Sequence, residues 1–273
     1  MNETNYNEDV FAGTVTIVVS AVCAAPYMVA LRAIRTDPEL RIMPAYRMIF
    51  NLGLADNLQL VAQVASAIFL FCGCVSAHDP VSQFFGGLIN AIWVVYVNLT
   101  GLLAFNRFVH ICFPFSVEWV FTKHNTTLLM GLMWLVGLVH LCLYWSPKAA
   151  VLYWPKDYGF GYDTSLPWSD LVWQMEYYNC WFSFGGAAIC YVCIFIYVRW
   201  NKATAGVREV SSATEIKVAI QAVLIAGFAL FMVILWHNYG LLFEEDKWTY
   251  LAINTGWILN SGINPLIYLT LNS

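Results

Sequence analysis

The stretch FFGGLINAIWVVYVNLTGLLAFNRFVHICF, residues 84–113, decides the class of fold. It has no charged residue before Arg107, and a helix needs only about 20 mainly apolar residues to cross a bilayer. The same criterion gives seven expected spans, at residues 10–32, 46–72, 84–113, 127–145, 178–199, 216–236 and 248–271. Six spans are the alternative, because Asp56 and its polar neighbours interrupt 46–72. The sequence therefore predicts an all-α membrane protein, with residues 1–273 as one seven-transmembrane helix bundle.

The composition supports a membrane protein and excludes other classes. Of the 273 residues 60% are hydrophobic and 11% are charged, whereas soluble domains carry about 25% charged residues. Thirteen basic and seventeen acidic residues give a formal net charge of −4, so no basic surface is available to neutralise phosphates. We therefore expect the lipid bilayer as a partner and no nucleic acid, and we exclude a soluble enzyme or a disordered regulator.

The basic residues predict the orientation. Most of them flank the loops after the first, third and fifth spans, whereas Lys148, Lys156 and Lys247 lie on the opposite side. By the positive-inside rule those three loops are cytoplasmic and the N-terminus is extracellular. The triplet Asn2-Glu3-Thr4 agrees, since it makes Asn2 a glycosylation acceptor on the outer side.

The longest expected loop, 146–176, is extracellular and rich in aromatic residues. Pro147, Pro155 and Pro167 remove backbone donors and favour extended geometry, so a folded loop capping the bundle is predicted. Its tryptophans and tyrosines fit either an aromatic belt at the membrane surface or a lid that faces a ligand. Three cysteines lie near the ends of spans: Cys72, Cys74 and Cys180. Two of them can form a disulfide bond if they meet on the oxidising side of the membrane.

Two motifs inside the spans suggest a switch. The last span contains Asn260-Ser261-Gly262-Ile263-Asn264-Pro265-Leu266-Ile267-Tyr268, in which Pro265 loosens the last turns and Asn264 and Tyr268 share a face. Asp56 lies in the middle of the second span, where a charge is costly, so we expect it to face Asn260 and Asn264. The alternative for Asp56 is a protonated, structural carboxyl group.

A third motif ends the span 84–113. Asn106-Arg107-Phe108 brings an arginine to the expected cytoplasmic end of the helix. Arg107 either snorkels to the lipid headgroups or pairs with Glu215, at the cytoplasmic start of the next-to-last span, and holds the helix ends closed.

These patterns together resemble the rhodopsin-like G-protein-coupled receptor superfamily. The segment 46–56, YRMIFNLGLAD, and the segment 103–108, LAFNRF, look most like the nematode serpentine chemoreceptors, class T first and class X next. The resemblance covers nearly the whole chain. It implies a multi-pass plasma-membrane receptor of sensory neurons that binds a small molecule outside and activates a heterotrimeric G protein inside. It also implies that Arg107 faces the G protein and that Asn264, Pro265 and Tyr268 form the switch of the last span.

The chain departs from the superfamily pattern at several positions. Asn106 replaces the acid that usually precedes the arginine. Ser82 stands where a disulfide cysteine is usual, and the loop 146–176 contains no cysteine. The absence of lysine from the last span argues against an opsin, because a retinal Schiff base needs an amine.

A ligand pocket is expected among aromatic residues in the outer half of the bundle. The candidates are Trp93, Tyr96, Tyr178, Trp181, Trp236, His237 and Trp257.

Two other classes of function remain as alternatives. An intramembrane hydrolase needs paired catalytic groups at one depth of the membrane. Asp56 is the only acid expected deep in a span, and the histidines at positions His110, His140 and His237 have different expected depths. We therefore expect no metal, no cofactor and no enzymatic activity. A ligand-gated channel or transporter with seven helices is the third reading. Receptors of that type have a cytoplasmic N-terminus, so the side on which Asn2 lies distinguishes them.

Overall fold

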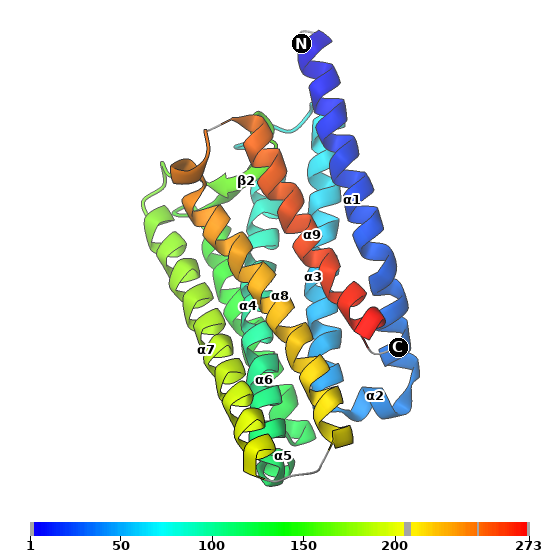
Figure 1. The fold of residues 1–273 in the computed structure, drawn as a ribbon. Helices are drawn as coiled ribbons and strands as arrows, with labels where there is room; N and C mark the ends of the chain where they lie inside the picture. The colour runs from blue at the N-terminus through cyan, green and yellow to red at the C-terminus, as the bar shows by residue number, and fades with distance from the viewer. Residues whose placement is uncertain (1–2, 205–208, 245, 272–273) are drawn as a thin grey trace.

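Long helices side by side, closed at one end by a β-hairpin, make up the computed structural model of the chain (Figure 1). It describes the backbone of residues 3–204, 209–244 and 246–271 and the side chains of residues 6–200, 223–244 and 246–265. The long helices are α1 (Glu3–Thr36), α3 (Pro44–Cys72), α4 (Pro80–Cys112), α6 (Lys123–Tyr144), α7 (Ser169–Thr204), α8 (Glu209–Leu242) and α9 (Lys247–Leu271). Short turns of helix, α2 (Pro38–Ile42), η1 (Pro114–Ser116) and α5 (Val117–Val120), connect them at the end away from the hairpin (Figure 1).

Six of the described helices are long and apolar enough to cross a membrane. They are Tyr6–Thr36, Pro44–Cys72, Pro80–Cys112, Lys123–Tyr144, Ser169–Trp200 and Val223–Leu242. The interrupted second span is among them, and α9 is not. Polar residues that face the bundle, including Asn254, Asn260 and Asn264, lower the apolarity of α9 and are themselves buried. A multi-pass helical membrane protein is thus the fold, and the seventh crossing stays a prediction.

Helix α4 lies at the centre of the bundle. It packs against α3, α6, α7, α8 and the first strand of the hairpin. The run Ile89–Val97 is buried along its whole length, as expected for a helix that is apolar all round and covered on all sides. The apolar stretch 84–113 therefore forms the helix around which the other helices are arranged.

Local sequence signals set the ends of several helices. Asp37, Asp79 and Thr122 accept hydrogen bonds from backbone N–H groups of the first turn of α2, α4 and α6, respectively. Helix α3 ends at Gly73, whose φ of 56° lies in the left-handed region that glycine adopts without strain. These caps place the starts and ends of the helices where the connecting turns require them.

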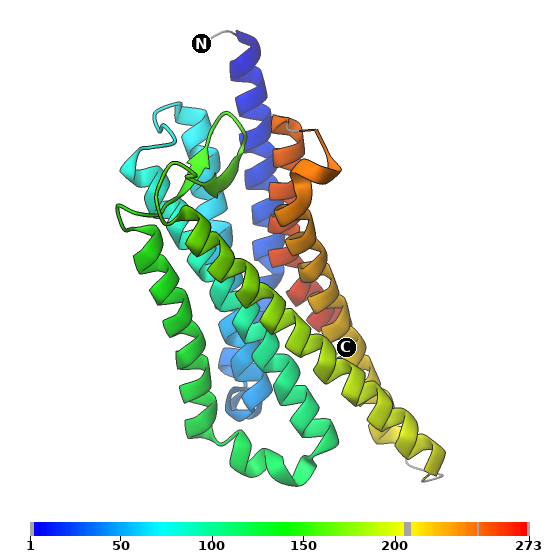
Figure 2. The ribbon, with the colours of Figure 1, turned by 90° about the vertical axis from the view of Figure 1, so that its left-hand side faces the viewer.

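The segment expected as the loop 146–176 is partly regular. Strand β1 (Val151–Trp154) pairs antiparallel with β2 (Gly159–Tyr162), with Val151 opposite Tyr162. The loop is shorter than predicted, because α7 begins at Ser169 and not near residue 178. Asp170 in the first turn suits the positive end of the helix dipole. Figures 1 and 2 both show the hairpin at the end of the bundle from which the N-terminal residues of α1 project.

Of the three cysteines near span ends, two are joined. Cys72 and Cys74 form a disulfide at the end of α3. Cys180 lies on α7, buried and free.

Candidate functional site

A cavity between α4, α7, α8 and α9 lies below the hairpin. Its walls are Trp93, Glu176, Met232, Val233, Trp236, His237 and Trp257. Four of the expected pocket residues, Trp93, Trp236, His237 and Trp257, therefore lie around one space. About 20 Å³ of it is free, roughly the room of one water molecule, so a larger guest requires side chains to move.

The three tryptophans pack edge to face. The ring centroids of Trp93 and Trp257 are 5.6 Å apart, and those of Trp236 and Trp257 are 5.1 Å apart. The indole N–H of Trp257 donates to Gln59 Oε1 at 2.7 Å, which directs that polar group toward α3. The cavity is thus lined by ring surfaces contributed by three different helices.

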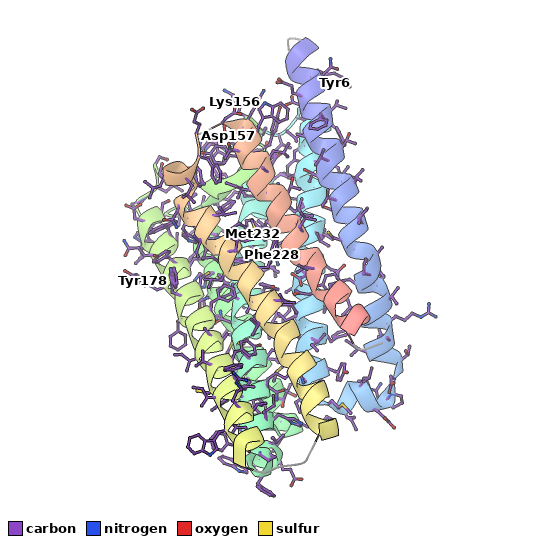
Figure 3. The ribbon with its side chains drawn as sticks, in the orientation of Figure 1. Tyr6, Lys156, Asp157, Tyr178, Phe228 and Met232 are labelled. Atoms are coloured by element: carbon purple, nitrogen blue, oxygen red, sulfur yellow. A yellow bond between two sulfur atoms is a disulfide. The ribbon has the colours of Figure 1, made fainter. Side chains whose placement is uncertain are left out.

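The other expected pocket residues lie elsewhere. Tyr96 is fully buried one turn along α4 from Trp93 and stacks against it, with centroids 5.4 Å apart. Tyr178 and Trp181 are exposed by 66% and 42% on α7, and Figure 3 shows Tyr178 pointing away from the bundle. Their place is typical of residues that face lipid.

Glu176 is a wall residue that the sequence pattern did not single out. Its side chain is buried, and Oε2 accepts hydrogen bonds from the Tyr162 hydroxyl and from Asn90 Nδ2 at 3.2 Å. Asn90 Nδ2 also lies 3.0 and 2.8 Å from the hydroxyls of Tyr144 and Tyr162, so its two hydrogens are shared among three acceptors. Burial raises the pKa of the Tyr162 hydroxyl, and the adjacent carboxylate raises it further, so Tyr162 remains a donor. A carboxylate and three hydrogen-bonding groups from α4, α6 and β2 thus form one buried network.

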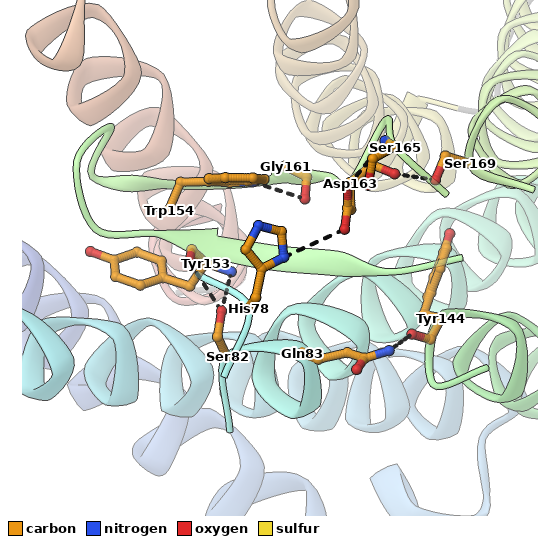
Figure 4. Close-up of polar contacts among 10 residues, drawn as sticks. All are labelled: His78, Ser82, Gln83, Tyr144, Tyr153, Trp154, Gly161, Asp163, Ser165 and Ser169. Carbon is orange, nitrogen blue, oxygen red and sulfur yellow. Dashed lines mark hydrogen bonds and ion pairs between the residues drawn. The ribbon is translucent and has the colours of Figure 1, made fainter. Parts of the chain in front are cut away.

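The hairpin is held on α4 by close backbone contacts (Figure 4). Ser82 Oγ donates to the carbonyl of Tyr153 at 3.0 Å and accepts from its N–H at 2.8 Å. A Cβ on Gly86 would lie 2.1 Å from the carbonyl oxygen of Val151, so only glycine permits this approach of the strand. Gln83 Nε2 donates to the carbonyl of Tyr144 at 3.0 Å and joins α6 to the same place. Ser82 therefore connects the helix to the hairpin, at the position where the superfamily pattern led us to expect a disulfide cysteine.

A larger cavity of about 390 Å³ lies under the hairpin. Trp154, Asp157 and Tyr162 from the hairpin segment line it, together with Tyr239 and Tyr250. Trp236 lines both cavities, so its side chain lies between them. Burial raises the pKa of the Asp157 carboxyl above its usual value, and the nearby Lys156 acts in the opposite direction. Figure 3 shows Lys156 and Asp157 at the hairpin end, above Met232 on α8.

Asp56 lies at the centre of a second polar group deeper in the bundle. Its Oδ2 accepts from the Tyr27 hydroxyl of α1 and from Asn264 Nδ2 of α9, the latter at 2.9 Å. Several polar atoms of this group are buried and have no hydrogen-bond partner among the described residues. They are Asp56 Oδ1, Asn264 Oδ1, Ser261 Oγ and the side-chain nitrogen and oxygen of Asn260. The structure thus places Asp56 against Asn264, with Asn260 close in sequence but not bonded to it.

Amide groups join α3 and α9 between the two sites. Gln63 Nε2 donates to Asn254 Oδ1 at 2.8 Å, and Asn254 Nδ2 donates back to Gln63 Oε1 at 3.1 Å. With the bond from Trp257 to Gln59, three polar contacts follow α9 from the hairpin toward Asp56. A movement of α9 relative to α3 must therefore break or exchange them.

At the opposite end, Arg107 is half-buried and Asn106 is buried on α4. Neither of the two ion pairs among the described side chains involves Arg107. The side chains of its expected partner Glu215 and of Tyr268 lie outside the described residues, as does Asn2. Pro265 is buried, and α9 continues as a helix past it.

Within the described part of the chain, no group of three or more His, Cys, Asp or Glu side chains is placed to hold a metal ion. His140 and His237 each bond to a carbonyl one turn earlier in their own helix, at 2.9 Å.

Comparison with known families gives one result. A model of the family described as "Serpentine type 7TM GPCR chemoreceptor Srt" matches residues 1–273. This agrees with the class T resemblance of the segments 46–56 and 103–108. No curated protein matches the chain.

Proposed function

The chain belongs to the Srt family of serpentine seven-transmembrane chemoreceptors, which are G-protein-coupled receptors, and on this basis we propose that it binds a small extracellular chemical beneath the hairpin and activates a heterotrimeric G protein at the opposite end. Receptor and chemosensory character follow from the family. The site, the partners and the orientation are our proposals.

The cavity bounded by Trp93, Trp236 and Trp257 is the observation that carries the ligand site. It combines apolar ring surfaces with a few polar groups, which is typical of small-molecule sites. A ligand there contacts α4, α8 and α9 at once.

Signalling then takes the form of a population shift. A ligand stabilises the open state only by the difference between its affinities for the two states. The Trp257–Gln59 and Gln63–Asn254 contacts tie α9 to α3, so a guest that moves Trp257 changes the hydrogen bonds along α9 as far as Asn264 and Asp56. We propose that this rearrangement, with Asn260, Pro265 and Tyr268, is the switch.

The G protein meets the receptor around Arg107. The arginine forms no ion pair with the described side chains, which leaves it available to Glu215 in the closed state and to the G protein in the open state. Asn106 in place of an acid removes a neighbouring carboxylate that would otherwise hold Arg107.

The proposed orientation follows the positive-inside rule. It places the hairpin and the N-terminus outside and Arg107 inside, in the plasma membrane, with α9 as the seventh crossing. Sensory neurons are the proposed cell type.

The test is G-protein activation by Arg107→Ala in cell membranes. We expect activation to be lost while surface expression remains at the level of the unmodified receptor. Arg41→Ala, on the exposed helix α2, is the matched control and should leave activation intact. Full activation by Arg107→Ala would remove the proposed role of this arginine.

A further inference from the structure

Glu176 is a buried acid without a positive partner in the described structure. Its side chain is 1% exposed. The two ion pairs among the described side chains join Lys247 to Glu8 and His78 to Asp163, so neither neutralises Glu176. A buried charge without a partner is energetically costly. Among the described side chains none supplies a positive charge that would compensate this carboxylate.

The hydrogen bonds of Glu176 favour a carboxylate. Asn90 Nδ2 can only donate, and the Tyr162 hydroxyl donates to the same oxygen, Oε2. No described side chain bonds to Oε1. One oxygen is thus held in place by the protein, while the other remains for a guest in the cavity that Glu176 lines.

The remaining wall of this cavity suits a cation. Trp93, Trp236 and Trp257 surround it, and tryptophan faces are the best aromatic partners for ammonium groups. His237 Nδ1 contacts the carbonyl of Val233 at 2.9 Å, so Nδ1 carries the proton in the neutral ring. Nε2 is then an acceptor, and it has no partner among the described residues. Ring faces and acceptors attract positive charge and repel anions.

The approach to the cavity also contains an acidic side chain. Asp157 lines the larger cavity under the hairpin, which shares Trp236 with the inner one. Lys247, near this end, is already bonded to Glu8. A cation that enters under the hairpin therefore meets the Asp157 carboxyl before it reaches Glu176.

We propose that the ligand is a small organic cation, a protonated or quaternary amine, whose charge lies between the Glu176 carboxylate and the faces of Trp93, Trp236 and Trp257. This rests on the proposed function, because it takes the inner cavity as the ligand site. The Trp236 side chain moves aside to admit the amine from the larger cavity.

Direct binding to the purified receptor in detergent tests the charge requirement, with tryptophan fluorescence and calorimetry as readouts. The probes are cyclohexylamine with cyclohexanol, and choline with its uncharged carbon analogue. We expect an amine to bind at least about tenfold more tightly than its neutral counterpart, which corresponds to the loss of one favourable charge interaction. Glu176→Gln keeps an acceptor for Asn90 and Tyr162 and should remove that preference.

Asp170→Asn is the matched control, since Asp170 is an exposed acid on the same helix and its loss changes the net charge equally. It should bind amines as the unmodified receptor does. Trp236→Leu serves as a second variant should Glu176→Gln fold poorly, and it should weaken amine binding more than binding of the neutral analogues.

Amines that fail to bind, that bind no better than their analogues, or that bind Glu176→Gln equally well overturn the inference. G-protein assays with the same probes separate this from failure of the proposed function. Activation by neutral chemicals alone would leave the receptor function standing without a cation site. Charge-dependent binding with no activation of any G protein would leave the cation site standing without the signalling role.

Discussion

Ser82 on α4 forms two hydrogen bonds to one residue of the hairpin, since its hydroxyl accepts from the backbone N–H of Tyr153 and donates to the carbonyl of the same residue. Both groups of Tyr153 are buried with it. A single hydroxyl thus joins the hairpin to α4, at the position where the superfamily pattern led us to expect a disulfide cysteine.

Ser82→Ala should destabilise the receptor. The variant leaves a buried N–H and a buried carbonyl without a partner, which costs about 1–3 kcal/mol. Thermal unfolding of the protein in detergent measures this as a lower Tm. Ser82→Thr keeps the hydroxyl and should lose less. Equal Tm values for Ser82→Ala and the unmodified chain would show that the hairpin is held by other contacts.

Gly86→Ala should displace the hairpin, because the added Cβ has no room beside the carbonyl of Val151. Overpacking of this kind costs about 1–3 kcal/mol. Gly185→Ala on α7 is the control, since nothing lies within 4 Å of its added Cβ, and alanine should be neutral or stabilising by up to about 1 kcal/mol there. The two variants should therefore differ in Tm, and equal values would contradict a tight contact between Gly86 and Val151.

Gln63 and Asn254 should be energetically coupled. Each single change to alanine leaves an amide in the bundle without its partner, whereas the double change removes both. The double variant is therefore expected to lose less stability than the sum of the single ones, by about 0.5–3 kcal/mol. A double-mutant cycle on unfolding free energies measures the difference. Strict additivity would mean that the two amides do not interact.

Asp56→Ala should destabilise more than Asp56→Asn. Alanine leaves the Tyr27 hydroxyl and the Asn264 amide as buried donors without an acceptor, at about 1–3 kcal/mol each, while asparagine retains an oxygen for them. Thermal unfolding of both variants compares them. Asn57→Ala is the control, because Asn57 bonds within its own helix to the carbonyl of Gly53. If Asn57→Ala lowers the Tm as much as Asp56→Ala does, Asp56 is not the acceptor on which Tyr27 and Asn264 depend.

The proposed seventh crossing, by α9, predicts that the two chain ends lie on opposite sides of the membrane. Epitope tags at each terminus, detected in intact and in permeabilised cells, should show the N-terminus outside and the C-terminus inside. Both tags on one side would mean that α9 does not cross the membrane. The proposed roles of Arg107 in G-protein coupling and of Asn264 in the switch would then no longer hold together.

The length and apolarity of the helices followed from the sequence. A backbone in lipid must satisfy its own hydrogen bonds, so an uncharged stretch such as 84–106 has few alternatives to a helix. The same reasoning anticipated that Asp56 would seek polar partners on the last helix, because a carboxylate has none in hydrocarbon. Trp93, Trp236 and Trp257 were expected in the pocket for a weaker reason, their aromatic type and depth.

Only the tertiary structure placed Glu176 in the cavity wall. In the sequence it ends what looks like a long loop, where an acid is ordinary. Helix α7 begins earlier, at Ser169, and its periodicity turns Glu176 inward to Asn90 and Tyr162, which lie far away along the chain. Ser82 and Gly86 are similar cases, since nothing in their neighbourhood predicts a strand of residues 151–154 against them. Apolarity is a local property that a sequence displays directly, whereas these contacts depend on which face each helix presents after packing, and only the folded bundle determines that.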